Sequence, residues 1–227
     1  MADVWPPAAV VVRTPRVELR WPSTDDLLAL TALAEEGIHD EGSMPFLTPW
    51  TRGTPAERAQ TVLLWNWRRA GEWERARWMW NPVVVVGSEV VGTQGMLAAD
   101  YAVTRTAETG SWLGRRHHGQ GIGKEMRAAI LHLLFAGLDA VRATTGAFED
   151  NAPSLGVTRS LGYRPAGDRL VASEGRPRRE LLYIMDRADW EPRRRDDIQL
   201  CGVEAARPFF GLAERADSRV EATAQSG

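Results

Sequence analysis

The chain has 227 residues, of which 44 % are hydrophobic and 26 % charged, as in an ordinary soluble globular protein, and no apolar run approaches the length of a membrane span. A formal net charge of −2 gives no global attraction to nucleic acid or to an anionic membrane, so we expect neither as a partner. The single cysteine, Cys201, excludes an internal disulfide framework, and the four histidines lack the spacing of a zinc site, so no metal is expected. The first residues lack the basic and apolar regions of a secretory signal, and we therefore expect a cytoplasmic protein.

The first part of the chain is predicted to contain one strand and two helices. Residues 1–15 are rich in proline and valine and are expected to form an extended N-terminal arm. Apolar and charged residues alternate over 16–21, which predicts a strand with one buried face. Hydroxyl side chains followed by acids at 23–26 and 54–57 predict two helix starts, the second with a capping box and a proline in its first turn. The segment 39–52 between the helices is broken by prolines and is expected to be a loop.

From about Trp78 the pattern becomes that of a sheet. Two apolar runs joined by a tight turn predict a hairpin of strands 82–86 and 90–96. Further strands and helices are predicted at 108–113, 122–138, 141–148, 151–161, 163–171 and 178–187. This order of elements predicts a single α/β domain with a mixed sheet over residues 16–192.

The last part of the chain, residues 193–227, is interpreted as a tail. It begins with the charge run Arg193–Asp197, which is typical of a solvated link. Residues 198–212 are too apolar for a free segment, so we expect them to dock on this subunit or on a neighbouring copy, which leaves a homo-oligomer open.

A turn of alternating glycines, Gly119-Gln120-Gly121-Ile122-Gly123, joins the strand 108–113 to the helix that follows. Such a turn exposes unpaired N–H groups at the positive end of the helix dipole, so it is able to hold a phosphate. The alternative is a plain strand-to-helix turn. The pattern fits neither the Walker loop, which needs Ser or Thr after Gly-Lys, nor the dinucleotide fingerprint, which needs a third glycine where Lys124 stands.

The run His118–Gly123 resembles the pyrophosphate loop of the GNAT acyltransferases, except that His118 replaces the leading Arg or Gln. The strand Glu108–Leu113 and the segments Asn151–Ser154 and Leu161–Tyr163 are similar to the corresponding motifs of the RimJ/RimL-like branch. Further similarity to an actinobacterial group that includes a mycobacterial succinyl-CoA transferase lies in Met44–Phe46, Pro49–Arg52, Gly110–Gly114, Glu125–Ala129 and Arg207–Gly211. The resemblance implies a mostly antiparallel sheet flanked by helices, with splayed central strands.

The resemblance also implies the residues that hold acyl-CoA. Backbone groups of Ser111, Trp112 and Leu113 would pair with the pantetheine arm, and the N–H of Ser111 would polarise the thioester carbonyl. The turn Gly119–Gly123, including Gln120, Gly121 and Ile122, would hold the pyrophosphate. His118 either donates to a phosphate or lies exposed.

Roles in the chemistry follow from the same resemblance. Ser154 is the candidate donor to the leaving sulfur, and Asn151 would orient the arm or a water; the alternative for both residues is helix capping. The tyrosine that many GNATs place seven residues after the asparagine is Thr158 here. Glu108 is the chosen general base, with Glu149 and Asp150 as rivals and an ion pair with arginine as the alternative.

These residues predict an N-acyltransferase that moves an acetyl or succinyl group from acetyl-CoA or succinyl-CoA to an amine of a small molecule or a protein N-terminus. A succinyl carboxylate requires a cation, for which Arg52 is the candidate; the alternative is that Arg52 is a surface charge. The competing hypothesis is an acyl-CoA-binding sensor or assembly module without turnover.

Overall fold

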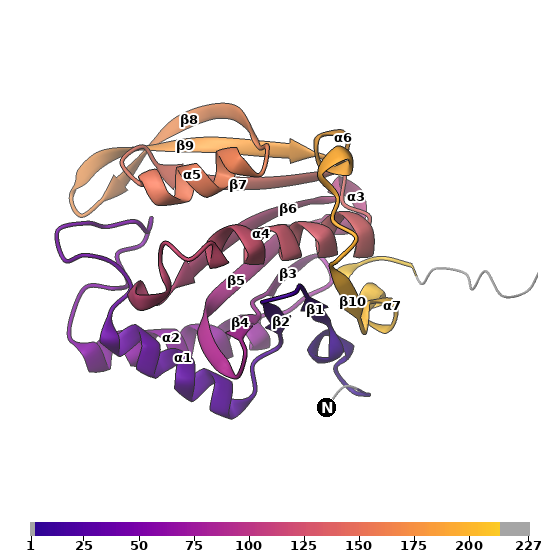
Figure 1. Ribbon diagram of the computed structural model, residues 1–227, viewed down its shortest axis with the longest axis horizontal. Helices are drawn as coiled ribbons and strands as arrows, with labels where there is room; N and C mark the ends of the chain where they lie inside the picture. The colour runs from indigo at the N-terminus through magenta and orange to yellow at the C-terminus, as the bar shows by residue number, and fades with distance from the viewer. Residues whose placement is uncertain (1–2, 214–227) are drawn as a thin grey trace, which may run out of the picture.

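A single sheet organises the computed structural model, which describes residues 3–213 (Figure 1). The order of its ten strands is β10-β1-β2-β4-β5-β6-β7-β9-β8, and β3 pairs with β5 beside this path. The strands are β1 Val11–Arg13, β2 Glu18–Arg20, β3 Arg77–Trp80, β4 Val83–Val86, β5 Glu89–Ala99, β6 Thr106–Leu113, β7 Arg142–Phe148, β8 Arg164–Ser173, β9 Arg176–Asp186 and β10 Gln199–Cys201. Between described strands, every pairing is antiparallel except that of β6 with β7. The mixed, mostly antiparallel α/β sheet predicted from the sequence is confirmed.

Seven α-helices lie within the described residues, and the two longest of them begin at capping boxes. The seven are α1 Thr24–Glu36, α2 Pro55–Gly71, α3 Tyr101–Thr104, α4 Ile122–His132, α5 Ala152–Ser160, α6 Arg187–Trp190 and α7 Val203–Ala206. Reciprocal capping boxes join Ser23 to Asp26 before α1 and Thr54 to Glu57 before α2. The helix predicted to end near Gly137 has two parts. Its α-helical part, α4, ends at His132, and a π-helical turn follows over Leu133–Gly137. No helix within residues 3–213 is both long and apolar enough to cross a bilayer.

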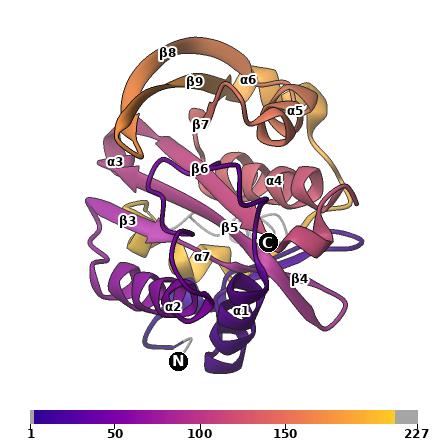
Figure 2. The same cartoon turned by 90° about the vertical axis from the view of Figure 1, so that its left-hand side faces the viewer.

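The two faces of the sheet bury different helices. The valines of β4 divide between them: Val84 belongs to the core under α4, whereas Val83 and Val85 belong to the core under α1 and α2. This alternation follows from the period of two in a strand, and a strand covered on both faces reads as a continuous apolar run. Figure 1 shows α4 and α5 in front of the sheet, and Figure 2 shows α1 and α2 together, away from them.

The first and the last strand pair at one edge of the sheet. Strand β1 lies within the segment predicted to be an arm, and it pairs with β2 on one side and with β10 on the other. Beyond β10, Phe210 is fully buried against Trp73 and Trp78. Trp73 and Trp78 thus pack inside this subunit. The predicted tail from residue 214 onward lies outside the described residues.

Candidate active site

The only parallel pairing among the described strands is short, and the two strands separate beyond it. Strands β6 and β7 share three ladder pairs, Thr106 with Arg142, Ala107 with Ala143, and Glu108 with Thr144. Strand β6 then continues to Leu113 and β7 to Phe148 without further ladder partners between them. The strands part in Figure 1 as they run away from α3, and we call this opening the fork. The splayed central strands implied by the sequence motifs are therefore present.

Two hydroxyls bridge the strands at the first position of the fork. The Thr109 hydroxyl donates to the carbonyl oxygen of Thr144 at 3.2 Å, and the Thr145 hydroxyl donates to the carbonyl oxygen of Thr109 at 3.0 Å. Side chains take the place of the missing ladder bonds, because a buried carbonyl left unpaired costs free energy. Beyond these bonds, the ladder between β6 and β7 does not resume.

Glu108 faces the side of the sheet covered by α1 and α2. Residues 108, 110 and 112 share one face of β6, and Trp112 on that face packs against Trp50 with 5.7 Å between ring centroids. Glu108 is accessible to solvent, yet its pKa is raised, first by desolvation and then by repulsion from Glu180. Gly110 has open space where a side chain would stand, which leaves room beside the carboxylate.

Glu180 is a second carboxylate at the fork, and the sequence patterns did not single it out. It is only 2 % exposed, and Arg169 donates to its Oε2 at 2.6 Å. Its carboxylate lies against Gly146 of β7, where a Cβ atom would overlap Oε1. A glycine within a strand that marks close approach of another group is the available signal. Of the rivals for the base, Asp150 accepts from Arg178 at 2.6 Å, and Glu149 lies 4.0 Å from the guanidinium of Arg179.

The glycine turn opens α4 beside the end of β6. Gly119 and Gly121 have φ angles of 73° and 78°, the left-handed region that favours glycine. Gly121 is the N-cap of α4, and the first bonds to its carbonyl come from the N–H groups of Lys124 and Glu125. The N–H groups of Ile122 and Gly123 precede those bonds and stand at the positive end of the helix. A turn of this geometry is able to hold a phosphate.

His118 and Arg16 flank the glycine turn. The ring of His118 is exposed, and its Nε2 lies 3.1 Å from the carbonyl oxygen of Leu113. Arg16, which the sequence patterns missed, donates to the carbonyl oxygen of Gln120 at 3.2 Å and to Glu125 at 2.7 Å. Burial alone raises the pKa of Glu125, but hydrogen bonds from Thr14 and Arg16 outweigh it and hold the pKa below its ordinary value. Arg16 thus compensates an acid in the first turn of a helix that would otherwise repel phosphate.

Asn151 and Ser154 lie where β7 leads into α5. The Asn151 side chain accepts from the N–H of Ser154 at 3.2 Å and so caps α5. Thr158 is 1 % exposed, so it is packed inside rather than presented to a substrate. Glu108 lies at the last ladder pair of β6, and Ser154 lies in the first turn of α5, which follows β7.

The loop between α1 and α2 reaches the β8–β9 hairpin. Arg52 donates to Glu174 at 2.6 Å and to the carbonyl oxygen of Glu41 at 2.8 Å. Arg178 of β9 donates to the carbonyl oxygen of Met44 at 2.6 Å. Arg52 therefore stands at the rim of the face that carries Glu108, with its charge already balanced by a carboxylate.

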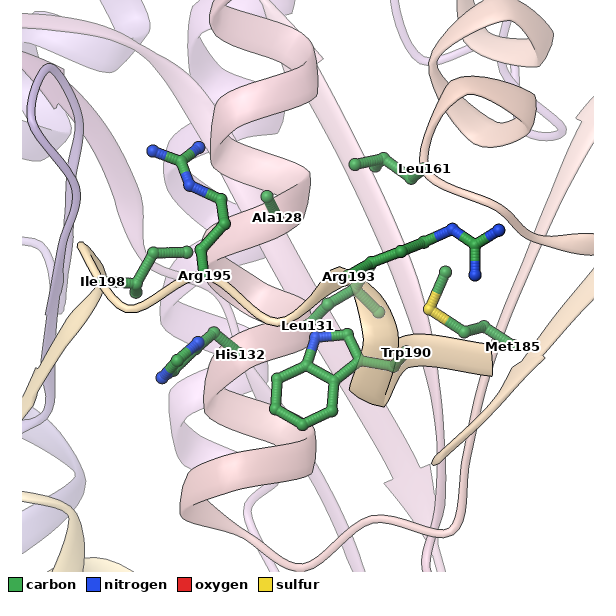
Figure 3. A pocket seen from close by; sticks show the side chains of 9 residues that line it. All are labelled: Ala128, Leu131, His132, Leu161, Met185, Trp190, Arg193, Arg195 and Ile198. Atoms are coloured by element: carbon green, nitrogen blue, oxygen red, sulfur yellow. The ribbon is translucent and has the colours of Figure 1, made fainter. Parts of the chain in front are cut away.

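A small pocket lies on the other side of α4 (Figure 3). Its lining comes from α4, the residue after α5, the end of β9 and the segment that follows β9: Ala128, Leu131, His132, Leu161, Met185, Trp190, Arg193, Arg195 and Ile198. Burial lowers the pKa of His132 and leaves its Nδ1 without a hydrogen-bond partner. The pocket is a packing seam away from the fork.

No group of acids, histidines and cysteine suited to a metal ion occurs within residues 3–213.

Comparison with known proteins identifies this arrangement. The family model described as an acetyltransferase (GNAT) domain matches residues 16–164, which is more than half of the chain. The structure of Mycobacterium smegmatis RimJ in complex with CoA-disulfide is 21 % identical, with a TM-score of 0.63 over 79 % of this chain and 88 % of that one. RimL, a ribosomal L7/L12 α-N-protein acetyltransferase solved with coenzyme A, is 19 % identical, with a TM-score of 0.62 over 78 % of this chain and 97 % of that one. A GCN5-related N-acetyltransferase from Brucella melitensis is 16 % identical, with a TM-score of 0.63 over 80 % of each chain.

The solved structures share the fold, and the family model matches the residues that build the fork and the glycine turn. The left-handed glycines, the N–H groups that open α4 and the open positions along the fork fit coenzyme A. The chain belongs to the acetyltransferase (GNAT) domain family.

Proposed function

We propose that this protein is an N-acyltransferase that moves an acyl group from acyl-CoA to a primary amine by direct attack. The observation that carries the proposal is the fork between β6 and β7, which opens beside the N-terminus of α4. The turn Gly119–Gly123 holds the pyrophosphate through N–H groups, and His118 lies beside it. Backbone groups of Ser111, Trp112 and Leu113 on β6 receive the pantetheine arm, so that the thioester lies in the fork.

Glu108 is the proposed general base. An amine is mostly protonated at neutral pH, and it becomes a nucleophile only after losing that proton. The raised pKa of Glu108 makes it a stronger base than an ordinary glutamate, and its accessible carboxylate faces the open side of Gly110. Glu180 contributes indirectly, because its buried charge helps to raise that pKa.

The transfer balances through one bond made and one bond broken. Glu108 takes a proton from the ammonium and releases it to solvent, and the amine nitrogen then bonds to the thioester carbon. The carbonyl oxygen carries negative charge in the resulting intermediate, which the N–H of Ser111 stabilises. The carbon–sulfur bond breaks, the hydroxyl of Ser154 gives a proton to the thiolate, and the second amine proton returns to Ser154 through water.

The acceptor that we propose is the N-terminal amine of a protein. RimL is described as an α-N-protein acetyltransferase of a ribosomal protein, and the fold is shared. The accessible carboxylate of Glu108 would attract the ammonium of an approaching N-terminus. A small-molecule amine is the alternative that the experiment separates.

For the acyl group, we propose acetyl as the preferred donor. The residue predicted to bind a succinyl carboxylate, Arg52, is paired with Glu174. A succinyl donor would have to displace that carboxylate, whereas an acetyl group makes no such demand. Succinyl transfer through Arg52 stays a prediction, and the ion pair gives it a direct test.

The deciding experiment follows coenzyme A thiol release from acetyl-CoA and from succinyl-CoA with a peptide that has a free N-terminus. The control is the same peptide with a blocked N-terminus, and a set of small amines forms the third arm. Release that requires the free peptide amine supports the proposal. Binding of acetyl-CoA without release in any arm would instead make the protein a sensor.

A further inference from the structure

A buried arginine lies directly beneath the fork. Arg127 of α4 is 5 % exposed, and its guanidinium donates to three side-chain oxygens: Gln94 Oε1 at 3.2 Å, Thr145 Oγ1 at 3.2 Å and Ser111 Oγ at 3.1 Å. All three acceptors are neutral. Within residues 3–213, no carboxylate oxygen lies within 4.0 Å of this guanidinium, whereas Arg16, Arg20 and Arg178 each pair with an acid.

The three bonds of Arg127 tie together three strands of the sheet. Gln94 lies on β5, Ser111 on the β6 arm of the fork and Thr145 on its β7 arm. The guanidinium therefore spans the opening from the α4 side, opposite the face that carries Glu108. Thr145 also closes the start of the fork through its bond to the Thr109 carbonyl, so Arg127 braces the strands just where they part.

An uncompensated buried cation is costly. Desolvation of an ion is costly, and hydrogen bonds to neutral oxygens do not supply the opposite charge that would balance it. Uncompensated charges of this kind gather at functional sites, where the balancing charge develops during the reaction. In the proposed transfer, negative charge builds on the thioester oxygen next to Ser111, which is one of the three residues that Arg127 holds.

We propose that Arg127 is a positioning residue for acyl transfer: it sets the separation of the fork arms through Ser111 and Thr145, and its charge stabilises the negative charge that develops above it. This inference rests on the proposed function. It assigns Arg127 an effect on the rate of transfer and none on the recognition of the nucleotide part of acyl-CoA, which binds at the opposite end of the arm. It also predicts the same effect for acetyl and succinyl donors, because both form the same oxyanion.

The test compares Arg127→Met, which keeps an unbranched apolar stem and removes the charge and its hydrogen bonds, with Arg127→Lys, which keeps the charge. Arg58→Met is the matched control. Arg58 of α2 also donates to neutral oxygens, namely the carbonyls of Ala34, Gly53 and Glu35 at 2.9–3.1 Å, far along the chain from the fork. Its role is structural, so its loss should lower the melting temperature and leave kcat unchanged.

For Arg127→Met we expect kcat to fall roughly tenfold to a hundredfold with both donors, while the Kd for coenzyme A measured by calorimetry stays within about twofold. Arg127→Lys should fall between this variant and the wild type. If Arg127→Met does not fold, the Lys variant decides alone, because a lower kcat with unchanged Kd supports the inference and an unchanged kcat overturns it.

Three results would overturn the inference: unchanged kcat with a lower melting temperature, as expected for Arg58→Met; a loss confined to succinyl-CoA; or a loss of coenzyme A affinity with kcat retained. Thiol release by the wild type distinguishes a failure of the inference about Arg127 from a failure of the proposed function. A wild type that releases thiol while Arg127→Met is equally fast refutes only the role of Arg127. A wild type that never releases thiol refutes both.

Discussion

Glu108 and Thr144 form the last ladder pair between β6 and β7, so the proposed base stands where the two strands begin to part. On the opposite face of the next position, the hydroxyls of Thr109 and Thr145 bridge the strands, and Arg127 supports Thr145 from below. The proposed base, the start of the fork and the buried cation are therefore linked through neighbouring positions of β6 and β7. The site of the proposed reaction coincides with the point where the pairing of the two strands ends.

Replacing Glu108 by Gln should remove the base and keep the shape. We expect kcat/KM with a peptide amine to fall by about 10²–10⁴ at neutral pH, the usual range for a general base. Coenzyme A binding should be unaffected, because Glu108 faces the acceptor side. A variant that keeps wild-type turnover over the whole pH range would contradict the assignment.

The same carboxylate predicts the acid limb of the pH profile. The pKa of Glu108 is raised by desolvation and by Glu180, and the base is active only when deprotonated. Activity should therefore fall as pH drops through this raised pKa, above the pH at which an ordinary glutamate would protonate. Glu180→Gln removes the repulsion and should move the limb to lower pH, provided circular dichroism shows an intact fold. A limb that stays in place would mean that Glu180 does not act on the base.

Gly121→Val should weaken coenzyme A binding. A branched side chain at φ 78° is strained, and its Cβ would lie 3.3 Å from the Arg16 guanidinium in the space of the phosphate turn. If the strain of about 1–3 kcal/mol falls on the bound conformation of the turn, Kd measured by calorimetry should rise by roughly fivefold to somewhat above a hundredfold. Gly71→Ala at the end of α2, where a Cβ meets nothing within 4 Å, is the control. Unchanged affinity in a folded Gly121→Val variant would sink the assignment of the turn.

Replacing Ser154 and replacing Asn151 should differ in their effect on the stability of the protein. Ser154→Ala is expected to lower kcat more than it weakens acyl-CoA binding, because proton donation to sulfur matters only in the transition state. Asn151→Ala should also lower the free energy of unfolding by about 1 kcal/mol, since its side chain caps α5. Denaturant unfolding and steady-state kinetics measure both effects. If Ser154→Ala weakens binding and spares turnover, Ser154 is a ground-state contact only.

The pair of Arg52 and Glu174 tests donor choice in two directions. Glu174→Gln frees Arg52 and should raise the ratio of succinyl to acetyl transfer, whereas Arg52→Ala should lower it and spare acetyl transfer. Arg52 has a side chain 43 % exposed, so the change should be only about two- to fivefold. Rates with both donors, measured for both variants, check this. Equal ratios in the two variants would remove Arg52 from donor recognition.

The sequence was sufficient for features that depend on neighbours along the chain. Both capping boxes, the glycine turn and the α5 cap could be read from spacing alone, because each needs residues no more than a few positions apart. Which carboxylate lies buried and which lies open depends on distant partners instead. Glu180 meets Gly146 and Arg169 only through the pairing of β9 with β7 and β8, and no local pattern contains that register.

The position of Arg127 in the helical pattern indicates a special role for this residue. It lies three residues before Ile130, on the edge of an apolar helical stripe, where a charge needs an explanation. Its acceptors on β5, β6 and β7 could not be predicted, because they come together only when the sheet forms. Strands β1 and β10 could not be predicted from the sequence either. Each has only three residues, and so short a segment carries too little alternation to distinguish a strand from an extended arm.

The most direct test of the account is the dependence of thiol release on the fork. Release from acetyl-CoA with a free N-terminal peptide amine should be rapid in the wild type, absent with the blocked peptide, and lost in Glu108→Gln while coenzyme A still binds. Acetyl-CoA that binds in the wild type without any amine-dependent release of thiol would contradict the assignment of this protein as an acyltransferase.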